Sequence, residues 1–387
     1  MKKEFITLAM LAAMVGACRS EKPAEVVTVK DHFKNDFLIG AAIPVTHVNG
    51  EDPKADSIVT LHFNSIVAEN CMKNEKIQPK EGEFFWDDAD KFVKYGEDRN
   101  MAIIGHALVW HSQLAPWFPV DNEGNLVSPE VLKERMKNHI STVVGRYKGR
   151  VKGWDVVNEA IEDDGSYRKS PFYEILGEEF IPLAFEYAHE ADPDAELYIN
   201  DYSMFLPKKR EAYVKLVNNL KKRGLRVDGI GMQSHIGMDY PEFDEYEKSI
   251  VDFAGTGCDV MITELDMSAL PTVQWGANVG DRRDFRKMTP EERKEYFEQF
   301  NPYKEGLPEE VSVAWNNRMD SVMDLYKKHA DKISRVTWWG TQDGMSWKNG
   351  FPIPGRTDYP LLFDRDYNMK PFMQKELPKP STLNPQP

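Results

Sequence analysis

The sequence predicts an α/β protein that folds as one closed (β/α)8 barrel. Along its 387 residues, eight strand-like apolar runs alternate with amphipathic stretches of helical period. This alternation implies parallel strands joined by right-handed crossovers, and eight such units close a TIM barrel. An open doubly wound sheet is the alternative, but no glycine-rich phosphate-binding turn follows the first run. Seven of the eight runs end in polar residues, at the strand ends where barrels build their sites.

The first 32 residues are expected to lie outside the barrel. Residues 1–18 start with two lysines, continue with a short apolar segment and end in VGAC, the pattern of a bacterial lipoprotein signal peptide whose lipobox cysteine, Cys18, is lipidated. An ordinary cleavable signal is the alternative. Residues 19–32 are expected to be a polar tether, residues 33–378 a single barrel domain and residues 379–387 a C-terminal tail. We then expect an exported outer-membrane lipoprotein, facing the periplasm or the cell surface.

The expected strands and helices follow one another in order. The strands are FLIGAAI (37–43), FNSIVAEN (63–70), MAIIGHALVWH (101–111), VKGWDVVNE (151–159), AELYINDYS (195–203), VDGIGMQSH (227–235), DVMITELD (259–266) and ISRVTWWG (333–340). The clearest amphipathic helices cover residues 129–147, 178–191, 207–224 and 315–332. Between residues 271 and 311 the alternation of strand-like runs and amphipathic helices is interrupted. We expect an enlarged loop with some helix there, after strand 7 and near the barrel mouth; a passive surface insertion is equally compatible with the sequence.

Composition excludes several classes of partner. The formal net charge is -14 and no basic tract is present, which argues against nucleic acid and against binding to an anionic membrane surface. The only membrane contact expected is the lipid anchor. Beyond Cys18, two cysteines remain, Cys71 and Cys258, and nothing in their spacing indicates a disulfide scaffold.

Two glutamates end predicted strands and are candidates for catalysis. Glu159 ends GWDVVNE and Glu264 ends VMITE. Two carboxylates that face each other across a pocket can cleave a glycosidic bond, because one protonates the leaving oxygen while the other attacks the anomeric carbon or activates water. A structural salt bridge is the alternative for either glutamate taken alone. Because Asp266 follows Glu264 by two residues, the two point the same way. His235 could then orient Glu264, with Asp266 fixing the tautomer of the histidine.

The surroundings of these glutamates favour a sugar over a metal. Trp110, Trp339 and Trp347 sit on or just after strand ends, where flat rings can stack on pyranose faces. A metal site built on His106, His111, His235 and Asp201 is the competing interpretation. However, the sequence has no HExxH and no CxxC motif, and it has no GxSxG elbow of an esterase. We therefore expect no metal and no cofactor.

Several motifs resemble glycoside hydrolase family 10, the retaining endo-β-1,4-xylanases. They are AENCMK (68–73), GHALVWHSQLAPW (105–117), WDVVNEA (154–160), NDYS (200–203), GIGMQSHI (229–236), GCDVMITELDM (257–267) and TWWGTQDGMSW (337–347), all in the family order. The resemblance spans roughly residues 37–377 and implies a family-10-like catalytic barrel. It also implies that xylan and xylo-oligosaccharides are the substrates, and we expect a monomer.

The resemblance implies a role for each matching residue. Glu159 would be the general acid/base and Glu264 the nucleophile. Glu69, Asn70, Lys73 and Gln113 would bind xylose on the glycone side; His106, Trp110, Asn158, Gln233 and His235 would surround the sugar at the cleavage point; Trp339 and Trp347 would wall that sugar in; and Tyr202 would act on the leaving-group side.

A double displacement would follow from these roles. Glu264, while anionic, is expected to raise the pKa of Glu159 and keep it protonated for the first step. The two carboxyl groups are expected about 5 to 5.5 Å apart, the spacing of a retaining enzyme. Two alternatives stay open, a non-catalytic glycan-binding protein on the same barrel and a β-1,4-glucanase.

Overall fold

The computed structural model describes residues 27–271, 288–351 and 355–377. The predicted signal peptide with Cys18 and the predicted C-terminal tail lie outside these residues, so both stay predictions. None of the described helices is both long and apolar enough to cross a membrane.

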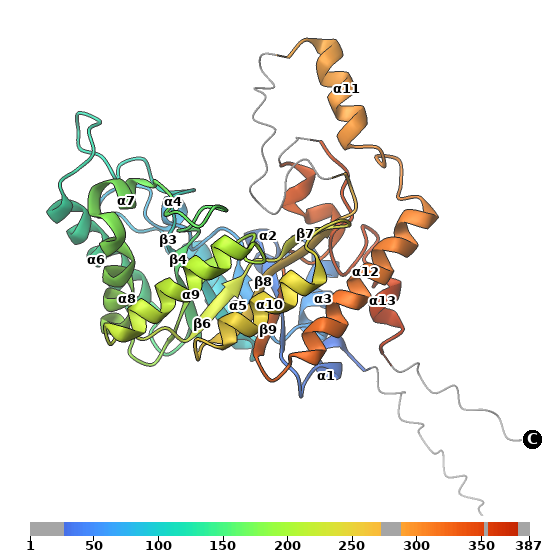
Figure 1. Cartoon of the computed structure of the whole chain (residues 1–387), viewed down its shortest axis with the longest axis horizontal. Helices are drawn as coiled ribbons and strands as arrows, with labels where there is room; N and C mark the ends of the chain where they lie inside the picture. Colours follow the sequence, from blue (N-terminus) through green and yellow to red (C-terminus); the bar gives the residue numbers. More distant parts are fainter. Residues whose placement is uncertain (1–26, 272–287, 352–354, 378–387) are drawn as a thin grey trace, which may run out of the picture.

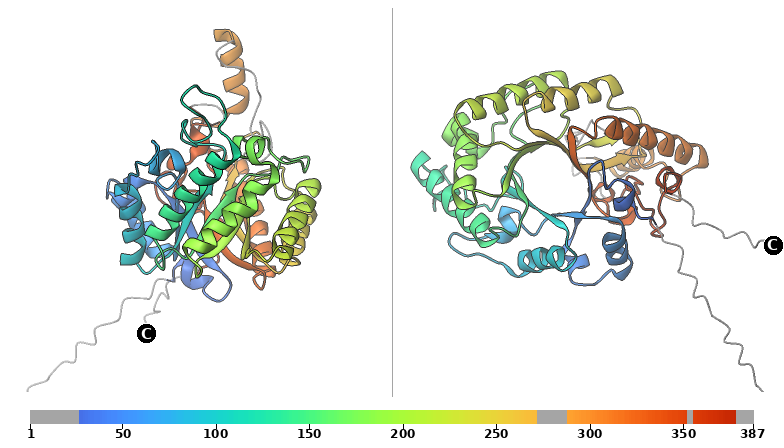
Figure 2. Two further views of the ribbon diagram at one scale, coloured as in Figure 1. Left: turned by 90° about the vertical axis from the view of Figure 1, so that its left-hand side faces the viewer. Right: turned by 90° about the horizontal axis from the view of Figure 1, so that it is seen from below.

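Eight parallel strands close a barrel, as the sequence predicted (Figure 2, right). They pair in the order β6-β5-β4-β3-β2-β1-β9-β8, and β8 returns to pair with β6. Their bounds are β1 Leu38–Ile43, β2 Ser65–Ala68, β3 Ala102–Val109, β4 Gly153–Asn158, β5 Glu196–Asp201, β6 Gly229–Met232, β8 Asp259–Ser268 and β9 Ile333–Trp338. Each lies within a predicted run, except that β8 continues for two residues beyond its run.

Helices surround the barrel (Figures 1 and 2). Their bounds are α1 Val29–His32, α2 Val45–Val48, α3 Pro53–His62, α4 Asn74–Ile77, α5 Asp87–Asp98, α6 Pro129–Arg146, α7 Pro171–Leu176, α8 Phe180–Ala191, α9 Pro207–Lys222, α10 Phe243–Ala254, α11 Pro290–Phe300, α12 Glu309–Lys328 and α13 Pro371–Gln374. The starts follow local chemistry: α6, for example, has Pro129 in its first turn, and the Ser128 side chain caps it.

Two predicted boundaries are wrong. The tether was expected to reach residue 32, but Val29 in α1 is fully buried, and Thr28 and Asp31 form a capping box that starts this helix. The barrel domain therefore begins at α1. The sixth predicted run is also not one strand. Ser234 has a positive φ of 63°, which interrupts the extended backbone, so β6 ends at Met232 and a short strand β7 (His235–Gly237) pairs separately with β8.

The enlarged segment after the seventh barrel strand does contain helix. Residues 272–287 lie outside the described residues, but α11 follows them and stands away from the barrel body (Figure 1). The next barrel helix, α12, starts at residue 309, six residues before the predicted start at residue 315. Its first turn carries two glutamates, which stabilise a helix N-terminus and were not part of the predicted apolar pattern.

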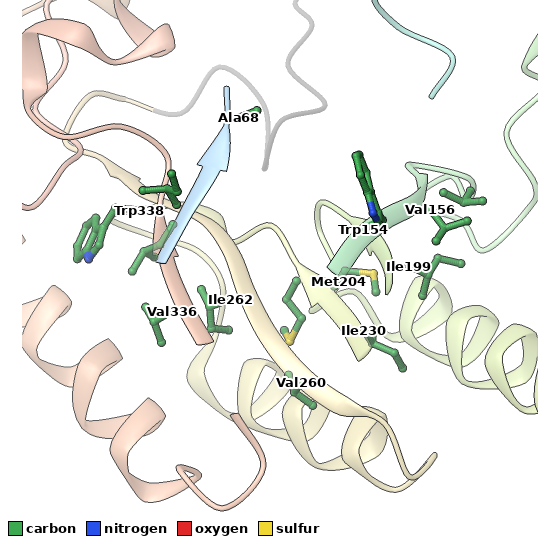
Figure 3. Close-up of a cluster of buried hydrophobic side chains, with 14 of the residues drawn as sticks. Ala68, Trp154, Val156, Ile199, Met204, Ile230, Val260, Ile262, Val336 and Trp338 are labelled. Atoms are coloured by element: carbon green, nitrogen blue, oxygen red, sulfur yellow. The ribbon is translucent and has the colours of Figure 1, made fainter. Parts of the chain in front are cut away.

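The core has two layers. Side chains from five barrel strands and Trp339 form a cluster of their own inside the barrel: Ala42, Val67, Ile104, Tyr198, Met261 and Trp339. The alternate strand residues, such as Val260, Ile262 and Val336, belong to the larger cluster that includes the helices (Figure 3). Gly153 shows how tight the inner layer is, since a Cβ there would lie 2.3 Å from the Tyr198 hydroxyl oxygen.

Candidate active site

The carboxyl ends of the strands surround a cavity of about 570 Å³. All fourteen residues predicted to catalyse or to bind substrate line it: Glu69, Asn70, Lys73, His106, Trp110, Gln113, Asn158, Glu159, Tyr202, Gln233, His235, Glu264, Trp339 and Trp347. Four further lining residues were not predicted to bind substrate, namely His111, Ser112, Arg168 and Phe351. Asp266 is fully buried behind the cavity wall.

Glu264 lies within β8 and is held by fixed partners on both carboxylate oxygens. Asn200 Nδ2 donates to Oε1 at 2.9 Å, and His235 Nε2 lies 3.2 Å from Oε2. Only 5% of the residue is exposed. A carboxylate in this position has few directions in which to move, so its free oxygen edge keeps one orientation toward the cavity.

Behind Glu264, charges of alternating sign form a chain into the protein. His235 Nδ1 lies 3.0 Å from Asp266 Oδ2, which also accepts a hydrogen bond from Trp347 Nε1 at 2.8 Å. The other oxygen, Asp266 Oδ1, lies 3.3 Å from Nζ of the buried Lys348. The contacts of His235 with Glu264 and Asp266 are those that the sequence predicted, while Lys348 was not foreseen.

Protonation of His235 follows from this chain. Burial would lower its pKa, but Asp266 and Glu264 outweigh burial and raise the pKa of His235 to about 9. Burial would likewise raise the pKa of Asp266, and His235 and Lys348 hold it below its usual value. At neutral pH the ring is therefore an imidazolium with a proton on each nitrogen. The predicted role of Asp266 changes accordingly: it stabilises the charge of His235 and does not select one neutral tautomer.

Glu159 is held differently, by neutral donors at the end of β4. Trp110 Nε1 donates to Oε2 at 2.8 Å and Gln233 Nε2 donates to Oε1 at 3.1 Å. The backbone of Glu159 is left-handed, with φ of 58°, and Arg168 Nε donates to its carbonyl oxygen at 2.8 Å. His111 Nε2 is 4.0 Å from Oε2. The positive φ turns the side chain out of the strand direction and into the cavity.

The predicted direction of the Glu159 pKa shift is wrong. Glu264 was expected to raise it. Burial does raise the pKa, but the charge of His111 and the hydrogen bonds from Trp110 and Gln233 outweigh burial and hold it below the usual value. Burial in turn lowers the pKa of His111. His111 is therefore neutral at pH 7, and its charge acts on Glu159 only in acid.

The residues predicted to bind the glycone form a hydrogen-bonding cluster. Lys73 Nζ donates to Asn70 Oδ1 at 3.1 Å and to Gln113 Oε1 at 2.8 Å, and it lies 4.8 Å from the centre of the Trp110 ring. Burial raises the pKa of Glu69, an effect that Lys73 partly offsets. Closely spaced donors and acceptors of this kind suit the hydroxyl groups of a sugar.

Aromatic rings and His106 form the wall nearest the barrel axis. The His106 ring centre lies 5.3 Å from that of Trp339 in an edge-on contact, and its Nδ1 is 2.8 Å from the buried Asp155 Oδ2. The Trp347 ring centre lies 5.1 Å from that of His235. Elsewhere in the lining, the Tyr202 hydroxyl accepts a hydrogen bond from Arg168 Nη2 at 2.5 Å. Among the described residues, no group of three His, Cys, Asp or Glu side chains is arranged to hold a metal ion.

Comparison with known proteins agrees with this site. The sequence model of Glycosyl hydrolase family 10 matches residues 28–377. An endo-1,4-beta-xylanase A of Xylanibacter ruminicola is 47% identical over 95% of this chain and 96% of its own length, and an endo-1,4-beta-xylanase of Geobacillus stearothermophilus is 39% identical over 90% and 97%. The solved structure of a GH10 endoxylanase from a sugarcane soil metagenome, 44% identical, superposes with a TM-score of 0.82 over 90% of this chain and 98% of that one. The chain belongs to glycosyl hydrolase family 10.

Proposed function

We propose that this protein is an endo-acting, retaining 1,4-β-xylanase that hydrolyses internal bonds of xylan. One observation carries the proposal: Glu159, which follows β4, and Glu264, within β8, line the same cavity together with tryptophan rings and side-chain amides. The relatives of highest listed identity bear the name endo-1,4-beta-xylanase. The site does not favour the alternative of a non-catalytic glycan-binding protein, since both glutamates are present and line the cavity.

The reaction assigned to these residues has two displacements. In the first, the Glu264 carboxylate attacks the anomeric carbon of xylose while Glu159 transfers its proton to the departing glycosidic oxygen. In the second, Glu159 removes a proton from water, which attacks the same carbon and releases Glu264. In the free protein the pKa of Glu159 lies below its usual value. We propose that substrate, by excluding water from the cavity, raises this pKa, so that Glu159 carries the proton for the first displacement.

The proposed substrate follows from the crowding at the cleavage point. Trp339, Trp347 and His106 meet around the space that the reacting sugar would fill. Xylose lacks the hydroxymethyl group of glucose and needs less room there. We therefore assign xylan rather than cellulose as the substrate.

A side-by-side assay tests this assignment. Purified protein is incubated with unsubstituted xylan and with carboxymethyl-cellulose, and reducing ends and product lengths are measured. We expect xylo-oligosaccharides of several lengths from the first and little release from the second. Proton NMR during the first minutes should show the β-anomer of the new reducing end. Equal release from both polymers would favour the glucanase, and no release from either would favour the glycan-binding protein.

We also propose that the chain is exported, anchored through lipidated Cys18 and monomeric. The support is the VGAC sequence after a short apolar segment, together with the net charge of -14, which argues against binding to an anionic membrane surface through basic side chains. Full-length protein expressed with radiolabelled fatty acid should be labelled and should partition with membranes. Cys18→Ala should abolish the label, and sedimentation of the soluble form should give a mass near 44.5 kDa or less.

A further inference from the structure

The short helix α4 is hydrogen-bonded to the loop that follows β3 and carries Gln113. Glu75 N donates to the Gln113 carbonyl oxygen at 3.0 Å, and Gln113 Nε2 donates to Glu75 Oε1 at 3.3 Å. Two residues further along the loop, Ala115 N donates to the side-chain oxygen of Asn74 at 2.9 Å. Gln113 lines the active-site cavity, whereas Asn74 and Glu75 do not line it. Helix α4 thus supports this part of the cavity wall without reaching the substrate space.

The backbone of Gln113 depends on this support. Its φ of 44° is a left-handed conformation, which a residue with a side chain keeps only where its surroundings hold it. The side chain of Gln113 takes part in the cluster predicted to bind the glycone: Oε1 accepts a hydrogen bond from Lys73 Nζ at 2.8 Å, and Nε2 donates to Asn70 Oδ1 at 3.2 Å. Because these contacts require the left-handed backbone, release of the loop would move Gln113 out of the cluster.

Asn74 is itself held in one orientation by buried neighbours. It is 6% exposed, and its Nδ2 lies 3.3 Å from Nδ1 of His139 in α6, which in turn lies 2.8 Å from Gln78 Oε1. The His139 ring packs against the rings of Phe84 and Phe118, and burial lowers the pKa of His139 to about 4, so the ring is neutral at pH 7. With its amide nitrogen against this ring, Asn74 keeps its oxygen turned toward the loop.

We propose that Asn74 is a positioning residue for Gln113, whose side-chain oxygen fixes the loop in the conformation that presents Gln113 to the substrate. The proposal rests on the proposed xylanase function and on the predicted role of Gln113 in binding the glycone. It adds a residue outside the cavity that determines how tightly the glycone is bound. Hydrogen bonds that a sugar makes equally in the ground state and in the transition state change KM and leave kcat unaltered.

A double-mutant cycle in the full-length protein tests the proposal. The four proteins are the unmodified chain, Asn74→Leu, Gln113→Ala and the double variant, and the substrate is an aryl β-xylobioside, both of whose sugars belong to the glycone. Asn74→Leu should raise KM about 2- to 10-fold, the range of one or two hydrogen bonds, and leave kcat within about 2-fold. Gln113→Ala should have a similar effect. Because Asn74 acts through Gln113, adding Asn74→Leu to Gln113→Ala should change KM by less than about 1.5-fold.

A conservative variant and a matched control accompany the cycle. Asn74→Asp keeps an oxygen that can accept from Ala115 N, and its second oxygen would face His139 Nδ1, so KM should return to within about 2-fold of the unmodified protein. The control is Asn64→Leu, just before β2 and thus at the end of the barrel away from the cavity. It removes a similar bond, in which Asn64 Oδ1 accepts from Ile39 N at 2.9 Å. This control should lower the melting temperature and leave KM unchanged.

The outcomes separate this proposal from the function on which it rests. Thermal melts show which variants are folded, and Asn74→Ala takes the place of Asn74→Leu if the latter is not. The proposal is overturned if KM is unchanged in the Asn74 variant, if Asn74→Asp does not restore it, or if the Asn74 effect is as large in the Gln113→Ala background as in the unmodified protein. An unchanged KM in Gln113→Ala would overturn it together with the predicted role of Gln113. Inactivity of the unmodified protein on both the aryl xylobioside and xylan would contradict the proposed function itself.

Discussion

The two catalytic candidates stand in contrasting surroundings. The side chain of Glu264 is 6% exposed, projects from within a strand and is backed by a chain of charges, His235, Asp266 and Lys348. The side chain of Glu159 is 12% exposed, ends its strand in a left-handed conformation and receives its hydrogen bonds from the neutral groups of Trp110 and Gln233.

This difference matches what each carboxylate has to do. A nucleophile must stay ionised and fixed, and an imidazolium whose own charge is stabilised by Asp266 favours that state. An acid/base must lose and regain a proton in every cycle, and neutral donors stabilise its anion less than a fixed cation would. The two tasks are thus separated by the groups that contact each carboxylate: a charged histidine lies against Glu264, whereas neutral side chains donate the hydrogen bonds to Glu159.

The largest effect should come from removing the nucleophile. Glu264→Ala should lower xylan hydrolysis by at least about 10⁴-fold, because it removes the carboxylate to which we assign the covalent intermediate. Azide should restore cleavage of an aryl β-xyloside by direct attack, which displaces the phenolate and gives the α-xylosyl azide. NMR of the azide product provides the measurement. Near-normal release of xylo-oligosaccharides by this variant would contradict the assignment.

Removing the acid/base should lower the rate of hydrolysis less than removing the nucleophile does, and the size of the decrease should depend on the leaving group. Glu159→Ala should slow xylan hydrolysis by about 10² to 10⁴-fold, the range typical of general acid catalysis. Aryl xylosides with acidic phenols need no proton on departure, so their first step should be nearly unaffected. Azide should then attack the glycosyl-enzyme and give the β-xylosyl azide, the opposite anomer to that from the nucleophile variant. If both variants gave the same anomer of xylosyl azide, Glu159 and Glu264 would not have the separate roles assigned to them.

Lys348 tests whether the charge chain reaches the nucleophile. Lys348→Met removes the cation 3.3 Å from Asp266 that helps to hold the pKa of Asp266 below its usual value, so Asp266 should bind a proton more readily and lose the charge that supports the His235 imidazolium. The acid limb of the pH profile of kcat/KM should move upward by roughly half to one unit. Lys348→Arg should restore the profile, and circular dichroism melts should show that the Met variant is folded at the assay temperature. A lower rate with an unmoved acid limb would mean that Lys348 acts only through packing.

The sequence predicted the contacts of strand residues in the site better than those of loop residues. Glu264, His235 and Asp266 lie on or beside strands, where the period-two pattern fixes which side chains face the cavity, and their contacts were predicted. Lys348 and Arg168 come from loops after the strands. Their positions depend on how each loop folds back on the barrel, and no local pattern records that.

The incorrect predictions also concern features that depend on tertiary contacts and not on a local sequence pattern. The pKa of Glu159 was predicted from the other glutamate alone, but it is set by a histidine from the neighbouring loop and two side-chain hydrogen bonds. The break at Ser234 was missed because nothing in GIGMQSH announces a positive φ at a serine. Fold class follows from hydrophobic periodicity summed over many residues, whereas each of these features depends on a single tertiary contact.

The smallest effect we predict is at His111, and it reports on the acid/base side alone. When protonated, His111 lowers the pKa of Glu159 from 4.0 Å away, so His111→Asn should raise that pKa. Since loss of the Glu159 proton sets the alkaline limb of kcat/KM, this limb should move to higher pH, by less than about one unit. The acid limb should stay in place. The Lys348 and His111 variants would then move opposite limbs of one profile. If either variant shifted both limbs, the charge chain behind Glu264 and the surroundings of Glu159 would be coupled, and their structural separation would have no effect on the reaction.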